Sequence, residues 1–366
     1  MPRVSEHVPP IDDGVQLSVI VPAYRCAGML RRCLEGLLAS NLPRSNWELI
    51  VVDDGSGDET SLVASASADQ VIVIPGGPRG PAFARNYGAE RARGAVLVFL
   101  DADVVVAHDA LHRFARRFDE TPTLGAVFGA YDTTPGDPGF LSQYRNLLHH
   151  WVHVSQPGDA WTFWTGLGAV RHSLFRALGG FDAVRYRAPQ IEDIEFGYRV
   201  ADAGHRILLD PAIQGTHLKR WTLLGMLRSD LVDRAIPWMQ LLMERGTAFG
   251  GGPLNVRRRE KAYTMLTALA LVAGLLALTT HSAHWLIAAA VPLAIVCAGN
   301  ASLLRWFARE RGPLFALCTM PCRLLFYLES GLGAAWAIVT YRRLGERTAR
   351  RSVDTLPRAG PADGAS

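Results

Sequence analysis

The stretch Leu97–Val106, LVFLDADVVV, decides the fold class that the sequence predicts. An apolar run that begins at Val96 ends abruptly at Asp101-Ala102-Asp103. Residues i and i+2 of an extended chain point to the same side, so the two carboxylates are predicted to face one point at the end of a buried strand. Buried carboxylates are usually paired or metal-bound, and Mg²⁺ or Mn²⁺ takes oxygen ligands that it shares with phosphates. A solvated turn at a strand end is the alternative that this triplet alone leaves open.

Short apolar segments alternate with helical patterns around this stretch. The segments predicted to form strands are 17–21, 47–52, 71–74, 95–100 and 125–130, and those predicted to form helices are 29–39, 81–93 and 108–118. This alternation predicts an α/β domain with a mostly parallel, Rossmann-like sheet and helices on both faces. Ligands of such sheets bind beyond the carboxyl ends of the strands, where both Asp53-Asp54 and Asp101-x-Asp103 fall. Asp53 is expected to cap its turn through its own side chain.

Four motifs in this order resemble the family 2 inverting glycosyltransferases: SVIVPAY (18–24), VVDDGS (51–56), RGPAFARNYG (79–88) and FLDAD (99–103). The resemblance covers Leu17 to Trp221 and implies the GT-A fold, a nucleotide-binding α/β domain. It also implies sugar transfer from a nucleotide-diphosphate donor with Mg²⁺ or Mn²⁺ as cofactor, and it favours UDP over GDP.

The same resemblance assigns a donor site. It implies that Asp54 accepts a hydrogen bond from the nucleobase, that Asp101 lies near the ribose and that Asp103 binds the metal. The loop residues that would line the base are Pro22, Ala23 and Tyr24.

Two arginines are candidates for binding the pyrophosphate. The sequence has no Gly-rich phosphate loop of Rossmann or P-loop spacing, so metal and arginine are expected to neutralise the diphosphate. Arg79 and Arg85 precede the strand that carries the carboxylates, and a guanidinium offers a planar fork suited to phosphate. Two ordinary surface arginines are the alternative.

The segment Ile191–Phe196, IEDIEF, places acids at a helix start. There they would favour the helix dipole, which is one interpretation. The family has a Glu-Asp pair here whose Asp deprotonates the acceptor hydroxyl, and such a base must lie close to the attacking oxygen. We therefore expect Asp193 to be the catalytic base and Glu192 to orient or bind the acceptor. Small residues in Thr165–Val170 repeat another family pattern, in which they let sugar and acceptor approach the backbone.

Histidines raise two further questions. His217 is a candidate metal ligand, because imidazole suits Mn²⁺, and a solvated loop histidine is the alternative. The segment 217–221, HLKRW, overlaps the Gln-x-x-Arg-Trp pattern of processive family members but has His in place of Gln, which favours transfer of a single sugar. His149, His150 and His153 lie close together without a Cys or a carboxylate at metal-motif spacing, so aromatic helix packing is expected there.

The last third of the chain is apolar and basic. Residues 221–245 predict an amphipathic helix that either lies in the membrane interface or packs on the domain. The uncharged runs Ala262–Thr279 and Trp285–Leu304 are long enough to span a bilayer. Because Arg257–Arg259 and Arg305–Arg311 flank these runs, the positive-inside rule places both basic clusters, and with them the α/β domain, in the cytoplasm.

The segment Pro313–Tyr341 is apolar but contains Pro321, Arg323 and Glu329. A third span would carry the basic residues Arg342–Arg351 outside, against the positive-inside rule, and charges within a span are costly. We therefore prefer a re-entrant or interfacial helix pair broken at Pro321, with Arg323 extending to the headgroups. A third span is the alternative.

The predicted organisation has five parts and five free thiols. The parts are a flexible tail (1–16), a GT-A glycosyltransferase domain (17–220), an amphipathic interface helix and linker (221–260, with a break at 249–253), transmembrane and interfacial helices (261–345) and a disordered basic tail (346–366). The first sixteen residues lack the apolar core of a signal peptide. The cysteines form no metal-type pairing.

The sequence therefore predicts a multi-pass protein of the cell inner membrane whose catalytic domain is cytoplasmic. It would transfer one sugar from a nucleotide-diphosphate donor to a membrane-associated, lipid acceptor, and no nucleic-acid partner is expected. Two alternatives remain open. A nucleotidyltransferase of related sheet topology would have a Gly-rich basic signature near the amino terminus. A membrane scaffold with an inactive transferase domain is disfavoured by the intact acids Asp54, Asp101, Asp103 and Asp193.

Overall fold

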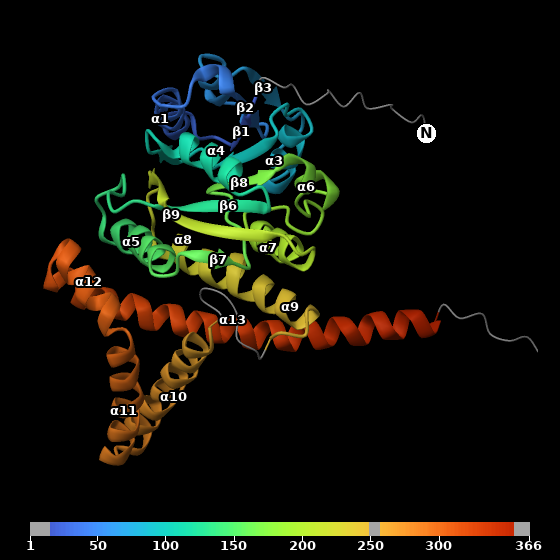
Figure 1. Ribbon diagram of the computed structural model, residues 1–366. Coiled ribbons are helices and arrows are strands. Elements are labelled where there is room, and N and C mark those ends of the chain that lie inside the picture. The colour runs from blue at the N-terminus through green and yellow to red at the C-terminus, as the bar shows by residue number, and fades with distance from the viewer. Residues whose placement is uncertain (1–14, 249–256, 355–366) are drawn as a thin grey trace, which may run out of the picture.

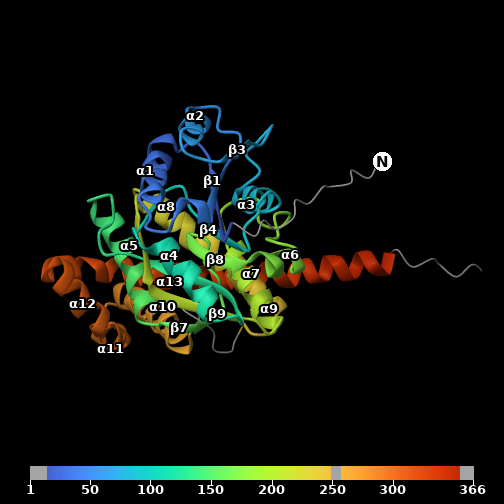
Figure 2. The same ribbon diagram turned by 45° about the horizontal axis from the view of Figure 1, so that its top comes forward.

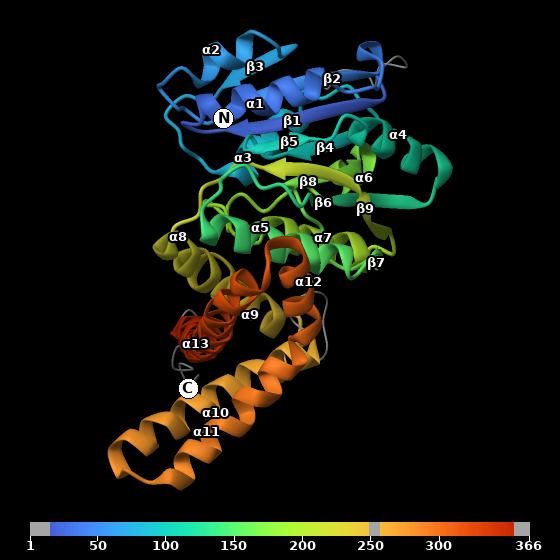
Figure 3. The same ribbon diagram turned by 90° about the vertical axis from the view of Figure 1, so that its left-hand side faces the viewer.

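The computed structural model describes residues 15–248 and 257–354, and within them an α/β domain stands on a base of helices (Figure 1). Helix α13 runs beneath the domain, and the α10–α11 hairpin extends away from both. A view turned by 90° shows α13 nearly end-on and the hairpin running crosswise to it (Figure 3). The hairpin and α13 therefore point in clearly different directions.

The α/β domain is built on a mixed sheet of nine strands within the described residues. Its order is β3-β2-β1-β4-β8-β6-β9-β5, with β7 also paired to β9. β1 to β4 pair in parallel as predicted, whereas β8 runs antiparallel between β4 and β6, and β5 and β7 run antiparallel to β9. The strands are β1 (Leu17–Ala23), β2 (Trp47–Asp53), β3 (Gln70–Val73), β4 (Val96–Leu100), β5 (Val104–Val106), β6 (Leu124–Tyr131), β7 (Gly158–Ala160), β8 (Leu167–Arg171) and β9 (Arg206–His217).

Helices cover both faces of the sheet, as Figure 2 also shows. Successive strand residues face opposite sides, so Val19 and Val51 pack with α1 and α4, whereas Ile20 and Ile50 pack with α3 and α7. The helices of this domain are α1 (Ala27–Leu38), α2 (Thr60–Ser65), α3 (Pro81–Ala89), α4 (Ala110–Glu120), α5 (Phe140–Val154), α6 (His172–Ala177) and α7 (Glu192–Asp202), with a 3₁₀ turn at Arg44–Asn46. The GT-A-type α/β architecture predicted from the sequence is thus confirmed.

The backbone between β4 and β5 corrects the geometry expected for the Asp-x-Asp triplet. Asp101 to Asp103 form a turn, closed by a 3.0 Å hydrogen bond from the Val104 amide to the Asp101 carbonyl, rather than a continuing extended strand. The Asp101 carboxylate accepts a hydrogen bond from Arg85, whereas the Asp103 carboxylate lies beside the His217 ring. The premise that the two carboxylates face one point because the chain is extended is therefore wrong.

The predicted amphipathic helix is continuous but contains a π-helical segment. It consists of α8 (Leu223–Arg228), the π-helix η2 (Ser229–Ala235) and α9 (Ile236–Glu244). The apolar face of α9 packs on the α/β domain, because Trp238, Leu241 and Leu242 are buried against Tyr198. The α9 part of the predicted amphipathic helix therefore packs on the domain and does not lie in the membrane interface. Leu224 of α8 remains exposed.

Two long helices of the base are apolar enough by length and composition to cross a membrane. They are α10 (Arg258–Thr280) and the Pro313–Tyr341 part of α13 (Pro313–Asp354). The second predicted span, Trp285–Leu304, is not one straight helix. α11 (Ala283–Gly299) and α12 (Ala301–Arg311) are bent by 59° at Asn300 and would count as a third span only if taken together. The bend follows Gly299-Asn300, a poor helix-forming pair.

Helix α13 differs from the predicted helix pair. Pro321 lies inside a continuous helix and does not break it. Arg323 does not extend outwards but is buried, with Nη2 2.7 Å from Glu260 Oε2 of α10. The Arg323 side chain thus points into the helical base, where it pairs with Glu260, and not outwards as predicted. Helix α13 continues to Asp354, so residues 346–354 are helical where disorder was predicted, consistent with the three Arg, one Ala and one Glu of that run, which favour helix. The predictions for 1–14, for the break at 249–253 and for 355–366 lie outside the described residues.

Candidate active site

The register of two strands brings the predicted metal ligands together. β5 pairs antiparallel with β9 so that Val104 lies opposite His217, and the Leu218 amide donates a 2.8 Å hydrogen bond to the Asp103 carbonyl. His217 Nε2 consequently lies 3.3 Å from Asp103 Oδ2. His217 is buried, stacks on Tyr131 with ring centroids 4.4 Å apart, and places Nδ1 2.5 Å from Asn146 Oδ1. The solvated-loop interpretation of His217 is therefore wrong.

This pair fits a divalent cation. With Nδ1 donating to Asn146, the Nε2 lone pair faces the Asp103 carboxylate, and a cation or a proton between them satisfies both. Burial acts to raise the pKa of Asp103, but the hydrogen bond and charge of His217, together with Lys219, prevail and lower it. Within residues 15–248 and 257–354 no group of three or more His, Cys, Asp or Glu side chains could hold a metal. Further ligands would therefore have to come from substrate or water.

Arg85 links two carboxylates instead of facing an open phosphate site. Its Nη2 lies 2.7 Å from Asp101 Oδ1 and its Nη1 lies 2.8 Å from Glu192 Oε1. Burial acts to lower the pKa of Arg85, and the charges of Asp101 and Glu192 outweigh it and raise the pKa. The Arg85 side chain is only 5% exposed, whereas that of Asp101 is 35% exposed. Arg85 thus ties the Asp-x-Asp turn to the start of α7 through its two Nη atoms, while its buried Nε makes no hydrogen bond to a described residue.

The Asp193 carboxylate is held by three hydrogen bonds and has a raised pKa. Its Oδ2 accepts hydrogen bonds from the Thr165 amide at 3.1 Å and the Thr165 hydroxyl at 3.3 Å, and its Oδ1 accepts one from the Ile194 amide at 2.8 Å. Burial, reinforced by the neighbouring charge of Glu192, raises the pKa of Asp193 to about 6. The next residue, Gly166, accepts a hydrogen bond from the Asp101 amide, so both acidic segments are anchored on the same short loop.

The predicted nucleobase loop is held by Asp54. Its two carboxylate oxygens accept hydrogen bonds from the Arg79 amide at 2.8 Å and the Gly80 amide at 2.7 Å, while the Asp54 amide donates to the Ala23 carbonyl. Asp53 caps its own turn by accepting from the Ser56 amide at 2.9 Å, as expected. Pro22 is half-buried and Ala23 buried, whereas Tyr24 is 40% exposed. Asp54 thus organises the loop whether or not it also contacts a base.

Cations near the carboxylates include two that the sequence analysis did not single out. Lys219 acts electrostatically on Asp103, and its Nζ lies 4.3 Å from the centre of the Trp221 ring. Arg234, in the π-helical segment, is close enough to Asp193 and Tyr131 to interact with their charges. No hydrogen bond or ion pair from Arg234 to another described residue is formed. A π-turn shifts the helical repeat by one residue, so the periodicity that placed Arg234 away from the apolar stripe does not hold across it.

Arg79 is exposed and stacks on Phe83, 3.6 Å from the ring centre.

The glycines of Thr165–Val170 allow close packing within the chain. A Cβ on Gly166 would lie 2.4 Å from the Trp164 ring, and a Cβ on Gly168 would lie 2.2 Å from the Trp164 carbonyl oxygen. The chain's own residues thus approach these two glycines closely, and the expected approach of sugar and acceptor stays a prediction. His149, His150 and His153 pack against Trp164, Trp306 and Phe128, which confirms aromatic helix packing.

Comparisons with known proteins agree with this architecture. Residues 18–178 match the family model described as glycosyl transferase family 2. Glycosyltransferase AglE of Haloferax volcanii is 40% identical over 91 residues, which are 24% of this chain and 30% of that protein. Probable glycosyltransferase YdaM of Bacillus subtilis is 25% identical over 211 residues, which are 54% of this chain and 49% of that protein. The matched segments therefore span no more than about half of these relatives' own lengths.

A solved structure is similar over nearly the whole chain. Mannosyltransferase PcManGT from Pyrobaculum calidifontis, in complex with GDP-Man and Mn²⁺, matches with a TM-score of 0.53 over 90% of this chain and 89% of its own. The identity is 22%, so this likeness supports the fold alone. Residues 18–178 are thus similar to family 2 glycosyltransferases, the fold is of the GT-A type, and the helices that follow include two apolar enough to span a membrane.

Proposed function

We propose that this protein is an inverting glycosyltransferase that moves one sugar from a nucleotide-diphosphate donor to a lipid acceptor at a membrane. The observation that carries the proposal is the Arg85 bridge. It joins Asp101, in the turn that also holds Asp103, to Glu192, next to Asp193. The bridge thereby fixes the position of Asp103, on the proposed donor side, relative to Asp193, the proposed base.

The proposed reaction is a single displacement. Asp193 removes the proton from the acceptor hydroxyl, whose oxygen attacks the anomeric carbon from the face opposite the leaving diphosphate. The hydrogen bonds from Thr165 hold the Asp193 carboxylate in place, and a pKa of about 6 leaves it mostly ionised at neutral pH. Glu192 is fixed by Arg85 through one oxygen, and its other oxygen accepts from the Gln190 amide at 3.0 Å. Glu192 therefore positions its neighbour and does not compete for the proton.

Asp103 and His217 would hold Mg²⁺ or Mn²⁺, which when bound offsets charge on the leaving diphosphate. Lys219, which acts on Asp103, supplies a second positive charge on that side. Both Nη atoms of Arg85 are paired and its side chain is buried, so we assign it a positioning role and propose the exposed Arg79 as the arginine that approaches the donor phosphates. Pro22, Ala23, Tyr24 and Asp54 remain the proposed nucleobase loop, with UDP as the preferred nucleotide.

The arrangement of the base supports a membrane acceptor. The α10–α11 hairpin extends away from the α/β domain. Helix α13 runs beneath that domain and crosswise to the hairpin (Figures 1 and 3). With the hairpin inserted in the inner membrane and the domain in the cytoplasm, α13 would lie along the membrane surface. The π-helical segment that carries Arg234 lies against α13, where Gly333 fits close to Ala235. An acceptor at the surface could thus approach Asp193 beside this segment.

The activity is tested with full-length protein, a panel of UDP- and GDP-sugars, Mn²⁺ or Mg²⁺, and a membrane lipid extract. Mass spectrometry should show a lipid heavier by one sugar residue and release of a nucleoside diphosphate, and NMR of the product should show an inverted anomeric centre. A product that has gained a nucleotidyl group would instead indicate a nucleotidyltransferase. Absence of both donor binding and donor turnover would indicate an inactive scaffold.

The membrane arrangement is tested by single cysteines in a background from which the five native cysteines have been replaced. A membrane-impermeant reagent added to intact cells should label a cysteine at Ser282, in the turn between α10 and α11, and should not label one at Ser352. Labelling at Ser352 from outside would show that α13 crosses the membrane and would overturn its placement along the surface.

A further inference from the structure

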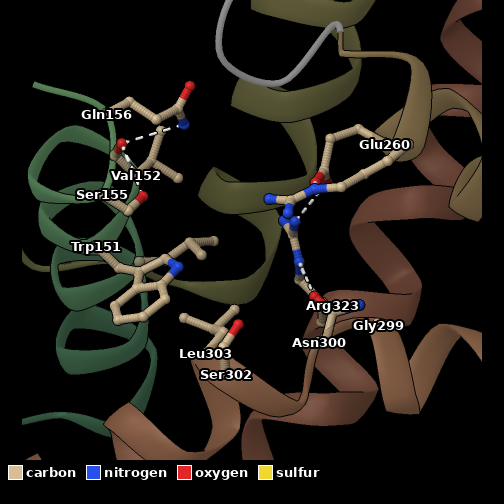
Figure 4. Close-up of a pocket in the computed structure, with 12 residues that line it drawn as sticks. Trp151, Val152, Ser155, Gln156, Glu260, Gly299, Asn300, Ser302, Leu303 and Arg323 are labelled. Atoms are coloured by element: carbon tan, nitrogen blue, oxygen red, sulfur yellow. Dashed lines mark hydrogen bonds and ion pairs between the residues drawn. The ribbon is translucent and has the colours of Figure 1, made fainter. Parts of the chain in front are cut away.

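A polar recess lies between the α/β domain and the helical base (Figure 4). Trp151, Val152, Ser155 and Gln156 of α5 line one side, and Arg323 of α13 faces them from the other. The start of α10 and the bend between α11 and α12 complete the walls. The recess opens to solvent at its mouth.

Two arginines share one carboxylate in this recess. Glu260 Oε2 lies 2.7 Å from Arg323 Nη2, and Glu260 Oε1 lies 3.1 Å from Arg259 Nε. Arg323 Nε also donates to Asn300 Oδ1 at 3.2 Å. These three ionisable side chains together carry one net positive charge, and they are the only ionisable residues among those lining the recess in the described chain.

Some of the guanidinium groups remain available to a ligand. Arg323 Nη1 and both Nη atoms of Arg259 make no hydrogen bond to any residue in 15–248 or 257–354, and none of the three is a sealed, unpartnered atom. They are therefore accessible from the recess or its mouth. Asn300, Ser302, Ser155 and Gln156 add neutral hydrogen-bonding groups. Guanidinium groups with free N–H donors are well matched to phosphate oxygens.

The recess is separate from the candidate active site. His149 and His153 of α5 face the sheet, where they contact Trp164. Trp151 and Val152 of the same helix face the recess. Helix α5 thus stands between the two sites, and a ligand in the recess would not reach Asp193.

The surroundings of the recess favour a lipid. Helix α10 begins at its wall and continues away from the domain with exposed apolar side chains, among them Met265, Leu269 and Val272. A headgroup in the recess would leave its acyl chains free to lie along this apolar surface. Basic pockets between helices at the cytoplasmic side of a membrane bind anionic headgroups in this way.

We propose that the recess binds the phosphate of an anionic phospholipid of the bilayer and thereby couples the α/β domain to its membrane helices. This inference depends on the membrane placement proposed above but not on the sugar-transfer reaction. The shared chemistry is a phosphate anion, and the source assigned here is a lipid headgroup rather than free phosphate.

The test measures lipid that remains bound to the full-length protein. The protein is reconstituted in phosphatidylcholine vesicles containing a fifth phosphatidylglycerol, extracted in mild detergent, and examined by native mass spectrometry. Arg259→Ala removes an exposed cation and preserves the Glu260–Arg323 ion pair, and Ser302→Trp fills the recess. Arg309→Ala is the matched control, since Arg309 is an exposed arginine on α12 that does not line the recess.

Bound phosphatidylglycerol should fall by roughly tenfold in Arg259→Ala and Ser302→Trp and should be unchanged in Arg309→Ala, a loss of about 1.4 kcal/mol in binding. Inorganic phosphate at millimolar concentration should not displace the lipid. Equal losses in Arg259→Ala and Arg309→Ala would overturn the site in favour of general surface charge. Displacement by inorganic phosphate would overturn the lipid assignment. Donor binding measured on the same samples keeps these outcomes distinct from a failure of the proposed reaction.

Discussion

The α/β domain and the helical base each contain a buried arginine that holds carboxylate groups, and the two clusters have opposite charge. Arg85 is shared by Asp101 and Glu192, which leaves one net negative charge beside Asp193 and Asp103. In the base, Arg259 and Arg323 share Glu260, which leaves one net positive charge. The same pairing chemistry therefore prepares one site for a cation and the other for an anion.

The difference also shows how a raised pKa arises. Burial is the larger cause at Asp193, and the excess negative charge of Glu192 adds to it. The charge of Arg85 acts in the opposite direction and lowers the pKa of Asp193, but burial and the charge of Glu192 prevail. The predictions below test whether the negative excess governs catalysis and whether the positive cluster governs stability.

The largest expected effect comes from removing the base. Asp193→Asn should lower kcat by roughly 10²–10⁴-fold, the usual contribution of general-base catalysis. In the unsubstituted protein, kcat should fall as the pH drops through about 6, because the carboxylate then becomes protonated. Steady-state kinetics from pH 5 to 8 measure both effects.

Two controls sharpen that prediction. Nucleotide affinity of Asp193→Asn should be nearly unchanged, since the base acts on the acceptor, and a large loss would place Asp193 in the donor site. Its thermal stability at pH 8 should equal or exceed that of the unsubstituted protein. A carboxyl whose pKa is raised on folding stabilises the fold while protonated, and that contribution is lost as the pH rises through the folded pKa. An uncharged Asn does not incur this loss.

The second effect concerns Asp103, which with His217 is proposed to bind the metal ion. Asp103→Asn should lower turnover by about 10³-fold and weaken donor binding while the fold persists, because Lewis-acid stabilisation is worth several kcal/mol. Mn²⁺ binding, followed by the electron paramagnetic resonance signal of the free ion, should weaken in parallel. Full activity of this variant in the presence of a chelator would rule out the metal role of Asp103 and His217.

The third effect concerns stability in the positive cluster. Arg323→Met leaves part of the Glu260 charge buried without its partner and should lower the free energy of unfolding by roughly 3 kcal/mol. Adding Glu260→Gln should recover most of that loss, since no unpaired charge then remains. Thermal unfolding in lipid nanodiscs measures both, with Arg309→Met as the exposed control. A double variant as unstable as Arg323→Met would show that packing, and not charge, is responsible.

The smallest effect tests Arg79 as the available donor-side arginine. Arg79→Ala should raise the donor KM by a few-fold, because an exposed cation contributes about 0.5–1 kcal/mol. Arg91→Ala is the matched control, since Arg91 also stacks on an aromatic ring, 3.7 Å from the centre of Tyr87, and is not among the residues placed at the site. An equal change in KM for both variants would argue against a direct contact of Arg79 with the donor.

The position of the candidate chemistry along the chain could be read from the sequence. Runs such as Val96–Leu100 predict buried strands, and the carboxyl ends of parallel strands meet at one edge of a sheet. That reasoning located Asp54, Asp101 and Asp103, the family resemblance added Asp193, and the affinity of imidazole for Mn²⁺ added His217. The structure does bring Asp103 and His217 together, because β5 and β9 pair in the required register.

The partners of the charged groups were decided only by the tertiary structure. Arg85 reaches Glu192 across 107 positions, and Arg323 reaches Glu260 across 63. Helical or strand periodicity relates residues a few positions apart and carries no information about such pairs. Without that information, the chemistry of arginine suggested that Arg85 binds phosphate and that Arg323 extends outwards from its helix. Composition and periodicity determined which segments form strands, helices and apolar surfaces. Long-range packing determined which charges are neutralised, and hence which site is left negative and which positive.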